Sequence, residues 1–420
     1  HVLSGIGLWH EAAIAMDAAT RVEKAYMHQR MIQPDQNWNY AHNLDYLCYI
    51  QEQLGMFDAA MTGVEQLVAG PRSAKKGMAA VGNFLDKFSA VRLLVKAERW
   101  DQILDSDDNL IAWDLKNPMD QFLSGYMRTH ALIGVGKLDD AEKELQKLKV
   151  PPGKPNGPAS GAAGPPKPAG PSAAKPSDGK NKPPSGIPPG MMDKVLARNV
   201  RLQELEGKLR LAQGKHLEGV RLLAEAAEEQ AENWSNDPPT HPMYIYNTLG
   251  DAYLELGSAK LAIEAYRKTL ETIKNDGFAL SGLVRAHAEL EEIEEAQTAL
   301  AKLKSVWSDA DLPNRRLELA IATGIEADAS LDAPIAERNY KREVLDKQGS
   351  SLWAAASAPP FTANDSSGES VQLVDYAGKN VILIFYQGGE CLHCMEQMQK
   401  ANKLVNAFKK LDTVIVAISK

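Results

Sequence analysis

The feature that most constrains this chain is an internal helical repeat. Alanine and leucine recur at the 3.6-residue spacing of amphipathic helices, and glycines interrupt them at short turns. Ala296 follows Ala262 by 34 residues, and Leu280, Leu283 and Leu300 stand at the equivalent core positions. Repeats of this length bury their apolar faces by stacking on one another. The period therefore predicts stacked helix pairs rather than one small globular core.

The clearest repeat resembles the tetratricopeptide (TPR) repeat. The residues that carry this resemblance are Tyr246, Leu249, Gly250, Tyr253, Gly257, Ala262 and Tyr266. Weaker copies are centred on Gly55, Gly136 and Gly214, Trp100 stands at the turn of a degenerate unit, and Gly7 to Ala19 matches only the second half of a repeat. The resemblance implies an all-α TPR superhelix in two arms, 1–150 and 191–325, which binds protein partners through its groove. It also suggests that the N-terminus is truncated.

The groove ligand stays unknown. Family members that clamp a terminal carboxylate carry Lys and Asn on the groove face, whereas Asn247 and Asp251 stand at the matching positions here. The resemblance therefore does not support that clamp.

A proline-rich segment separates the two arms. Residues 151–190 contain 13 of the 23 prolines, interspersed with Gly, Ala, Ser and Lys. Proline removes amide donors and the small residues offer little to bury, so the composition predicts an extended, disordered linker.

Composition excludes several classes of function. The 420 residues carry 47 Lys and Arg against 55 Asp and Glu, a net charge of −8, which gives no basic field for nucleic acid. No run of about 18 apolar residues occurs, so no transmembrane segment is predicted. At roughly 150 residues per domain, the length allows two or three domains.

The pattern changes from helical to mixed near the C-terminus, after a connector at 326–351. Val381 to Phe385 is a continuous apolar run, which predicts a strand buried on both faces, and Thr413 to Ser419 predicts a second strand. Between them, Cys394 to Leu411 has one apolar helical face. Residues 352–420 therefore predict strand, turn, helix, strand.

Two of the three cysteines, Cys391 and Cys394, stand at the junction of the strand and the helix. Unpaired amides and the positive end of the helix dipole favour thiolate there, and a two-residue spacer lets the two sulfurs close a disulfide. His393 between them either tunes the thiols with positive charge or is an exposed spacer. Glu390 either relays protons or is an ordinary acidic turn residue.

This region resembles the redoxin group, which includes the AhpC/TSA proteins and peroxiredoxins on a thioredoxin-like fold. The resemblance rests on Ala358 to Phe361, on Gly378-Lys379 and on Phe385 to Cys394. It implies that Cys394 matches the peroxidatic cysteine, whereas in thioredoxin-like reductases the first cysteine, Cys391, is the nucleophile. The chain holds only two strands and one helix of the central fold, so the resemblance also implies a partial domain without robust activity of its own.

Other roles for the cysteines are weaker. Haem attachment needs a His after the second cysteine, where Met395 stands, and tetrahedral zinc needs a second ligand pair, so neither a metal nor a cofactor site is predicted. A purely structural disulfide between Cys391 and Cys394 is the remaining alternative. Cys48 stands at a helix-packing position and is expected to be buried.

The sequence thus predicts a multidomain protein: a helical scaffold followed by a partial α/β thioredoxin-like domain. Its predicted function is a thiol-disulfide oxidoreductase or peroxiredoxin-like peroxidase that uses Cys391 and Cys394, with a thiol reductant or client protein as partner. The alternative is a non-catalytic interaction protein with a redox-inactive redoxin remnant. By analogy with bacterial fusions of this kind, an extracytoplasmic location is favoured.

Overall fold

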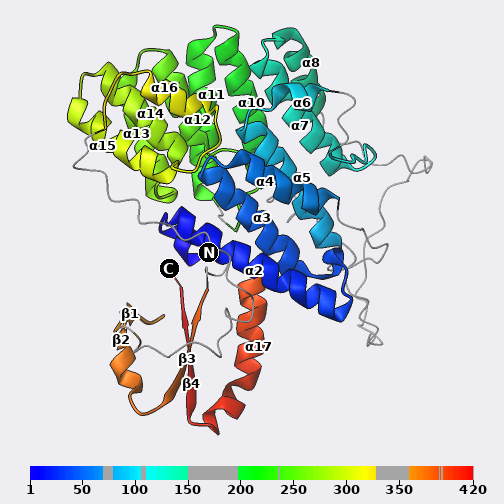
Figure 1. Ribbon diagram of the computed structural model, residues 1–420, viewed down its shortest axis with the longest axis vertical. Helices are drawn as coiled ribbons and strands as arrows, with labels where there is room; N and C mark the ends of the chain where they lie inside the picture. The colour runs from blue at the N-terminus through cyan, green and yellow to red at the C-terminus, as the bar shows by residue number, and fades with distance from the viewer. Residues whose placement is uncertain are drawn as a thin grey trace, which may run out of the picture. The chain divides into compact units, whose positions relative to one another are not determined.

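The chain forms two compact units, His1–Gln348 and Gly349–Lys420 (Figure 1). A computed structural model describes residues 1–69, 79–105, 110–149, 197–234, 237–327, 358, 360–386, 388 and 391–419. The predicted linker 151–190 and nearly all of the connector 326–351 lie outside these residues.

Helices build the first unit, and most of them pair as hairpins with their neighbours in the chain (Figure 1). Their bounds are α1 (Val2–Gly5), α2 (Trp9–Arg30), α3 (Trp38–Gln53), α4 (Phe57–Val68), α5 (Ala79–Lys96), α6 (Trp100–Leu104), α7 (Pro118–Gly134), α8 (Leu138–Lys149), α10 (Arg198–Ala212), α11 (His216–Glu232), α12 (Ile245–Glu255), α13 (Ala259–Thr272), α14 (Gly277–Glu289), α15 (Ile293–Val306) and α16 (Arg315–Ile321), with a 3-10 turn at Pro34–Gln36. No helix among the described residues is long and apolar enough to cross a membrane.

Glycines end the first helix of several hairpins. Gly55, Gly136, Gly214 and Gly257 have φ between 67° and 78°, a left-handed conformation that glycine adopts without steric cost. After α10, for example, the Lys215 amide donates to the carbonyl of Arg210, which has no hydrogen-bond partner within the helix because it lies in the last turn. The glycine-centred turns predicted from the sequence are therefore confirmed.

Small residues also let neighbouring helices approach closely. The ring of Tyr266 on α13 is fully buried between Gly250 of α12 and Gly282 of α14, where an added Cβ would lie 2.6 Å and 2.1 Å from ring carbons. Cys48 on α3 is likewise fully buried, and a Cβ on Gly63 would lie 2.4 Å from its sulfur. The predicted packing role of Cys48 is confirmed.

The helical segments on the two sides of the linker share one hydrophobic core. Helix α10 packs against α7 and α8, and hydrogen bonds join the first helices of the unit to its last helices. The indole of Trp9 donates to the carbonyl of Lys274 at 2.9 Å, and that of Trp307 donates to the carbonyl of Gln53 at 2.9 Å. The two segments are thus parts of a single unit.

A buried charge cluster ties α3 to α5. Arg92 donates to Asp45 and Glu52, and Lys96 donates to Glu52 at 2.8 Å, with all four side chains almost completely buried. Arg92 also donates to the carbonyl of Pro239 at 3.0 Å. The cluster therefore anchors the loop between α11 and α12 as well as the two helices.

The described residues of the second unit form two small sheets and one long helix. Strand β1 (Thr362–Asn364) pairs antiparallel with β2 (Ser370–Gln372), and a 3-10 turn follows at Leu373–Tyr376. Strand β3 (Asn380–Phe385) pairs in parallel with β4 (Thr413–Ile418), and α17 (Leu392–Lys409) connects them. The predicted order of strand, turn, helix and strand is confirmed.

The predicted burial of the first apolar strand is wrong. Exposed and half-buried residues make up β3, and the Phe385 side chain is 65% exposed. The reason is that, among the described residues, only β4 pairs with β3. An apolar run therefore indicates a strand, but the number of neighbouring elements decides how much of it is buried.

Candidate redox site

The β3–α17–β4 segment positions the two cysteines. Two parallel strands need a crossover connection, and here α17 supplies it. The amide of Tyr386, just after β3, donates to the carbonyl of Ile418 at 2.9 Å, so the pairing with β4 continues past the last strand residue. Helix α17 begins at Leu392, which places the Cys-x-x-Cys segment where strand gives way to helix.

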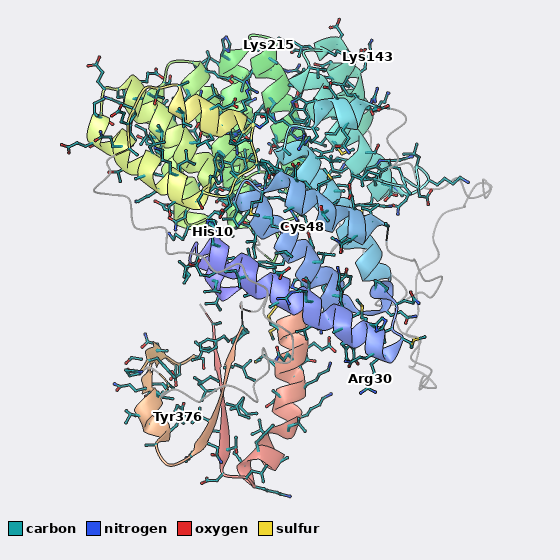
Figure 2. The ribbon with its side chains drawn as sticks, viewed as in Figure 1. His10, Arg30, Cys48, Lys143, Lys215 and Tyr376 are labelled. Atoms are coloured by element: carbon teal, nitrogen blue, oxygen red, sulfur yellow. A yellow bond between two sulfur atoms is a disulfide. The ribbon has the colours of Figure 1, made fainter. Side chains whose placement is uncertain are left out.

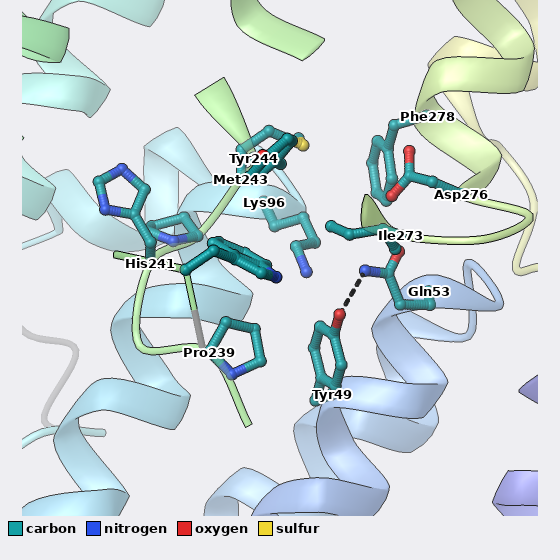
Figure 3. Close-up of a pocket in the computed structure, with 12 residues that line it drawn as sticks. Tyr49, Gln53, Lys96, Pro239, His241, Met243, Tyr244, Ile273, Asp276 and Phe278 are labelled. Carbon is teal, nitrogen blue, oxygen red and sulfur yellow. Dashed lines mark hydrogen bonds between the residues drawn. The ribbon is translucent and has the colours of Figure 1, made fainter. Parts of the chain in front are cut away.

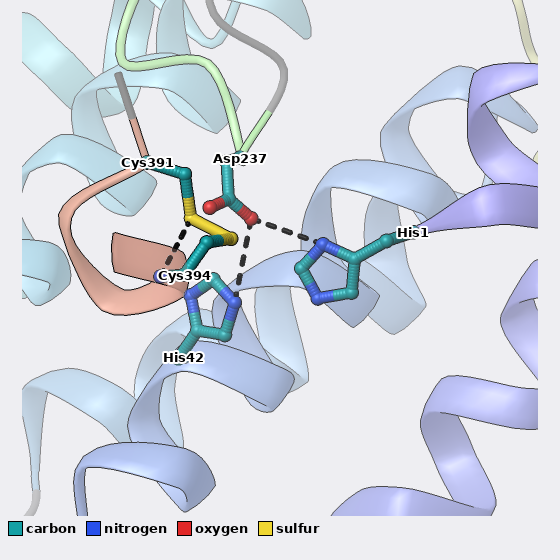
Figure 4. Close-up of a disulfide and its surroundings, with 5 residues drawn as sticks. All are labelled: His1, His42, Asp237, Cys391 and Cys394. Atoms are coloured by element: carbon teal, nitrogen blue, oxygen red, sulfur yellow. Dashed lines mark hydrogen bonds and ion pairs between the residues drawn. A yellow bond between two sulfur atoms is a disulfide. The ribbon is translucent and has the colours of Figure 1, made fainter. Parts of the chain in front are cut away.

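Cys391 and Cys394 form a disulfide at the N-terminus of α17 (Figure 4). Their Cα atoms are 5.2 Å apart, a separation that a disulfide spans without backbone movement. Cys391 is the N-cap of the helix, and its sulfur accepts a hydrogen bond from the Cys394 amide at 3.2 Å. The Cys391 carbonyl accepts from the Met395 amide at 2.9 Å, which starts the helical hydrogen-bond ladder.

This placement favours redox chemistry at the sulfur of Cys391. The first amides of a helix lack intrahelical partners and carry the positive end of the helix dipole, so they stabilise negative charge. The Cys394 amide is directed at the Cys391 sulfur, so a thiolate there would accept the same hydrogen bond. Both cysteines are half-buried, with part of each side chain open to a reactant.

The other candidate residues lie elsewhere or outside the described part. His393 lies in the first turn of α17, but its side chain is outside the described residues, and so is Glu390. Cys48 lies in the helical unit (Figure 2), where burial raises the pKa of its thiol well above the ordinary value. Cys48 therefore stays protonated and is a packing residue rather than a reactive thiol.

A small cavity in the helical unit contains a buried lysine that sequence reasoning missed (Figure 3). Burial lowers the pKa of Lys96, although the neighbouring Glu52 opposes that shift. The ammonium donates to Glu52 at 2.8 Å and lies 5.2 Å from the centre of the Tyr49 ring. Because its charge is paired and the cavity is small, Lys96 stabilises the fold rather than serving as a nucleophile.

Two further clusters join residues that are distant in the sequence. Glu204 accepts from Tyr126 at 2.7 Å and lies 2.8 Å from His241, and all three are buried. In the second cluster, His1 and His42 both lie beside Asp237. No local spacing signals either cluster, because their members come from different helices and loops.

Comparisons with known proteins found one family match and one curated relative. Residues 354–420 match the sequence model of the AhpC/TSA family. A chloroplastic peroxiredoxin Q from Suaeda salsa is 30% identical to this chain over 91 residues, which are 22% of this chain and 41% of that protein. The chain thus spans less than half the length of this curated relative. The Cys391–Cys394 disulfide therefore lies within the part of a mostly helical chain that matches the AhpC/TSA redoxin family.

Proposed function

We propose that this protein is a thiol-dependent oxidoreductase whose redox group is the Cys391–Cys394 pair. The observation that carries the proposal is the closed disulfide at the N-terminus of α17, with the Cys394 amide directed at the Cys391 sulfur. The match of the surrounding residues to the AhpC/TSA family supports the same chemistry. Cys48 takes no part, because it is buried in the other unit.

The amide geometry favours thiol-disulfide exchange with Cys391 as nucleophile. The Cys391 thiolate attacks a substrate disulfide, a mixed disulfide forms, and one substrate thiolate leaves. The Cys394 thiolate then attacks Cys391, which closes the intramolecular disulfide and releases the second substrate thiolate. Two electrons pass from the cysteine pair to the substrate, and a thiol reductant reopens the pair by the reverse exchange.

Peroxide reduction is the other reaction within this proposal, and the similarity to a peroxiredoxin Q supports it. The attacking thiolate takes one peroxide oxygen and becomes a sulfenic acid, while the rest of the peroxide leaves as an alcohol or water. The second cysteine then condenses with the sulfenic acid, which forms the disulfide and releases water. Cys394 is the attacking residue in this case, as the redoxin resemblance implies.

The test is thiol alkylation followed by mass spectrometry of the full chain across a thiol redox buffer. The proposal predicts that the pair opens and closes reversibly, and that a mixed disulfide accumulates on Cys391 when Cys394→Ser removes the resolving thiol. Accumulation on Cys394 in Cys391→Ser, together with sulfenic acid after peroxide, assigns the peroxidase reaction instead. Cys48→Ala is the matched control, because it removes the cysteine outside the pair.

A second candidate is a protein-binding scaffold made by the helical unit, with a redoxin segment that does not turn over. The repeat-like packing of glycines against Tyr266 favours a TPR-like architecture for this unit. If Cys391 and Cys394 fail to re-form a disulfide after reduction, the oxidoreductase proposal is wrong and the scaffold is the remaining function. Protein partners of the helical unit would then bind the wild type and Cys391→Ser equally well.

A further inference from the structure

Three side chains with metal-binding atoms meet in the helical unit, far from each other in the sequence (Figure 4). His1 precedes α1, His42 lies on α3, and Asp237 lies in the loop between α11 and α12. Asp237 Oδ1 is 3.0 Å from His1 Nδ1 and 3.5 Å from His42 Nε2. All three candidate ligand atoms lie within 4.8 Å of one another.

Aromatic stacking orients the two imidazoles. The His42 ring stacks on Trp38, one turn earlier in α3, with centroids 5.5 Å apart. The His1 ring stacks on His42 at 5.3 Å and lies 4.4 Å from the Tyr46 ring. Tyr46 also makes a 2.9 Å hydrogen bond with Ser4, which ties α1 to α3. Both rings are therefore held by packing before any ligand arrives.

Buried arginines hold the loop that carries the carboxylate. Arg92 donates to the carbonyl of Pro239 at 3.0 Å, and Arg201 donates to the carbonyl of Thr240 at 2.7 Å. Pro239 is itself buried, so the loop is packed into the helical unit. Asp237 is thus fixed beside the two histidines by contacts that do not involve its own side chain.

We propose that His1, His42 and Asp237 bind one divalent transition-metal cation of the zinc class, through two imidazole nitrogens and one carboxylate oxygen. Zinc bonds of about 2.0–2.1 Å in a tetrahedral arrangement place neighbouring ligand atoms about 3.3 Å apart. The two separations to the carboxylate, 3.0 and 3.5 Å, lie on either side of that value, and the two imidazole nitrogens lie within 4.8 Å of each other. Two imidazoles and a carboxylate suit zinc and its neighbours better than magnesium or calcium, which prefer oxygen ligands.

The bound cation would have a structural consequence. It would connect the start of the chain, α3 and the α11–α12 loop, and the fourth coordination position would remain for water or an external ligand. The sequence predicts no metal site because metal sites are recognised in a sequence by short spacings between ligands, and these three residues come from three separate segments. The proposal is independent of the redox function, since its ligands all belong to the helical unit.

Calorimetric titration with ZnCl₂ tests the proposal, using the tag-free full chain in its disulfide form after treatment with a chelator. The expected result is one equivalent of Zn²⁺ bound, with an affinity at least about tenfold lower in Asp237→Asn and in His42→Phe. Phenylalanine at position 42 keeps an aromatic ring for the stacking on Trp38. His216→Phe is the matched control, because His216 is an exposed histidine on α11, and it should leave the affinity unchanged.

A second set of measurements separates this site from the thiols, which also bind zinc when reduced. The Cys391→Ser/Cys394→Ser double variant should keep the full affinity, and Co²⁺ should give the absorption bands of a low-symmetry N,O site without thiolate charge transfer. Circular dichroism checks that each variant keeps its helices. The absence of zinc binding to the wild type would overturn the proposal, and so would equal affinity in well-folded Asp237→Asn or loss of binding in the cysteine double variant.

Discussion

Glu52→Gln, which removes the charge of Glu52, should destabilise the helical unit more than most conservative substitutions. Glu52 is fully buried and accepts from Arg92 Nε at 2.9 and 3.1 Å and from Lys96 Nζ at 2.8 Å. Glu52→Gln keeps the side-chain shape but removes the carboxylate to which Lys96 donates, while Arg92 keeps Asp45 and Lys96 is still attracted by Asp276. Breaking a buried ion pair from one side costs about 3–5 kcal/mol. Because the glutamine amide keeps one acceptor oxygen, we expect the free energy of unfolding to fall by an amount near the lower end of this range, about 3 kcal/mol.

Urea unfolding followed by far-ultraviolet circular dichroism measures this loss. The matched control is Asp58→Asn, since Asp58 pairs with Arg99 at 3.1 Å but its side chain is 76% exposed. An exposed pair of this kind contributes at most about 1 kcal/mol. A second variant, Glu52→Gln with Lys96→Met, removes the surplus cation and should recover part of the loss. If Glu52→Gln costs no more than Asp58→Asn, the reasoning from buried charge is refuted.

Three further predictions concern other buried groups. Gly282→Ala should destabilise the helical unit by about 1–3 kcal/mol in urea, because its Cβ would overlap the Tyr266 ring, whereas Gly5→Ala, with open space around it, should be nearly neutral. Burial lowers the pKa of His130 to about 4, so between pH 6.5 and 4 this residue gains a proton only in the unfolded chain. The free energy of unfolding should therefore fall by up to about 3 kcal/mol as the pH is lowered through that window. His130→Gln should flatten the plot of unfolding free energy against pH in this window, and an unchanged slope would contradict the assignment. Cys48, fully buried, should alkylate only when the unit unfolds, so labelling under native conditions at the rate of an exposed thiol would show that its environment has been misjudged.

Local patterns allowed much of the fold to be predicted. Gly136 and Gly214 mark helix ends because a left-handed backbone at a turn excludes most other residues. The junction of strand and helix at Cys391 followed from an apolar run beside an amphipathic segment, and the structure places a disulfide there. These signals reside within a few residues of each other, so a single sequence is enough to recognise them.

Long-range contacts could not be predicted from these local patterns. Nothing in the neighbourhood of Trp9 or Trp307 indicates that their indoles cap carbonyls at the other end of the helical array. The cluster of His1, His42 and Asp237 was missed for the same reason, because each residue alone is an ordinary polar side chain. The exposure of β3 also depends on how many elements surround it, which the pattern of its own residues does not encode.

The structure of the second unit separates two steps of the proposed chemistry. Disulfide closure depends on the start of one helix, where backbone hydrogen bonds already hold Cys391 and Cys394 in position. Selective peroxide reduction additionally needs groups that orient the substrate, and orientation supplies a large part of enzymatic rate enhancement. None of the described residues of this unit is buried, so these residues form no enclosed pocket that would orient a substrate. We therefore expect this chain to exchange with a small disulfide such as oxidised glutathione, yet to reduce hydrogen peroxide no faster than free cysteine with the same thiolate fraction. Stopped-flow comparison with free cysteine measures both rates, and fast peroxide reduction that Cys394→Ser abolishes would show that these residues already form a complete peroxidase site.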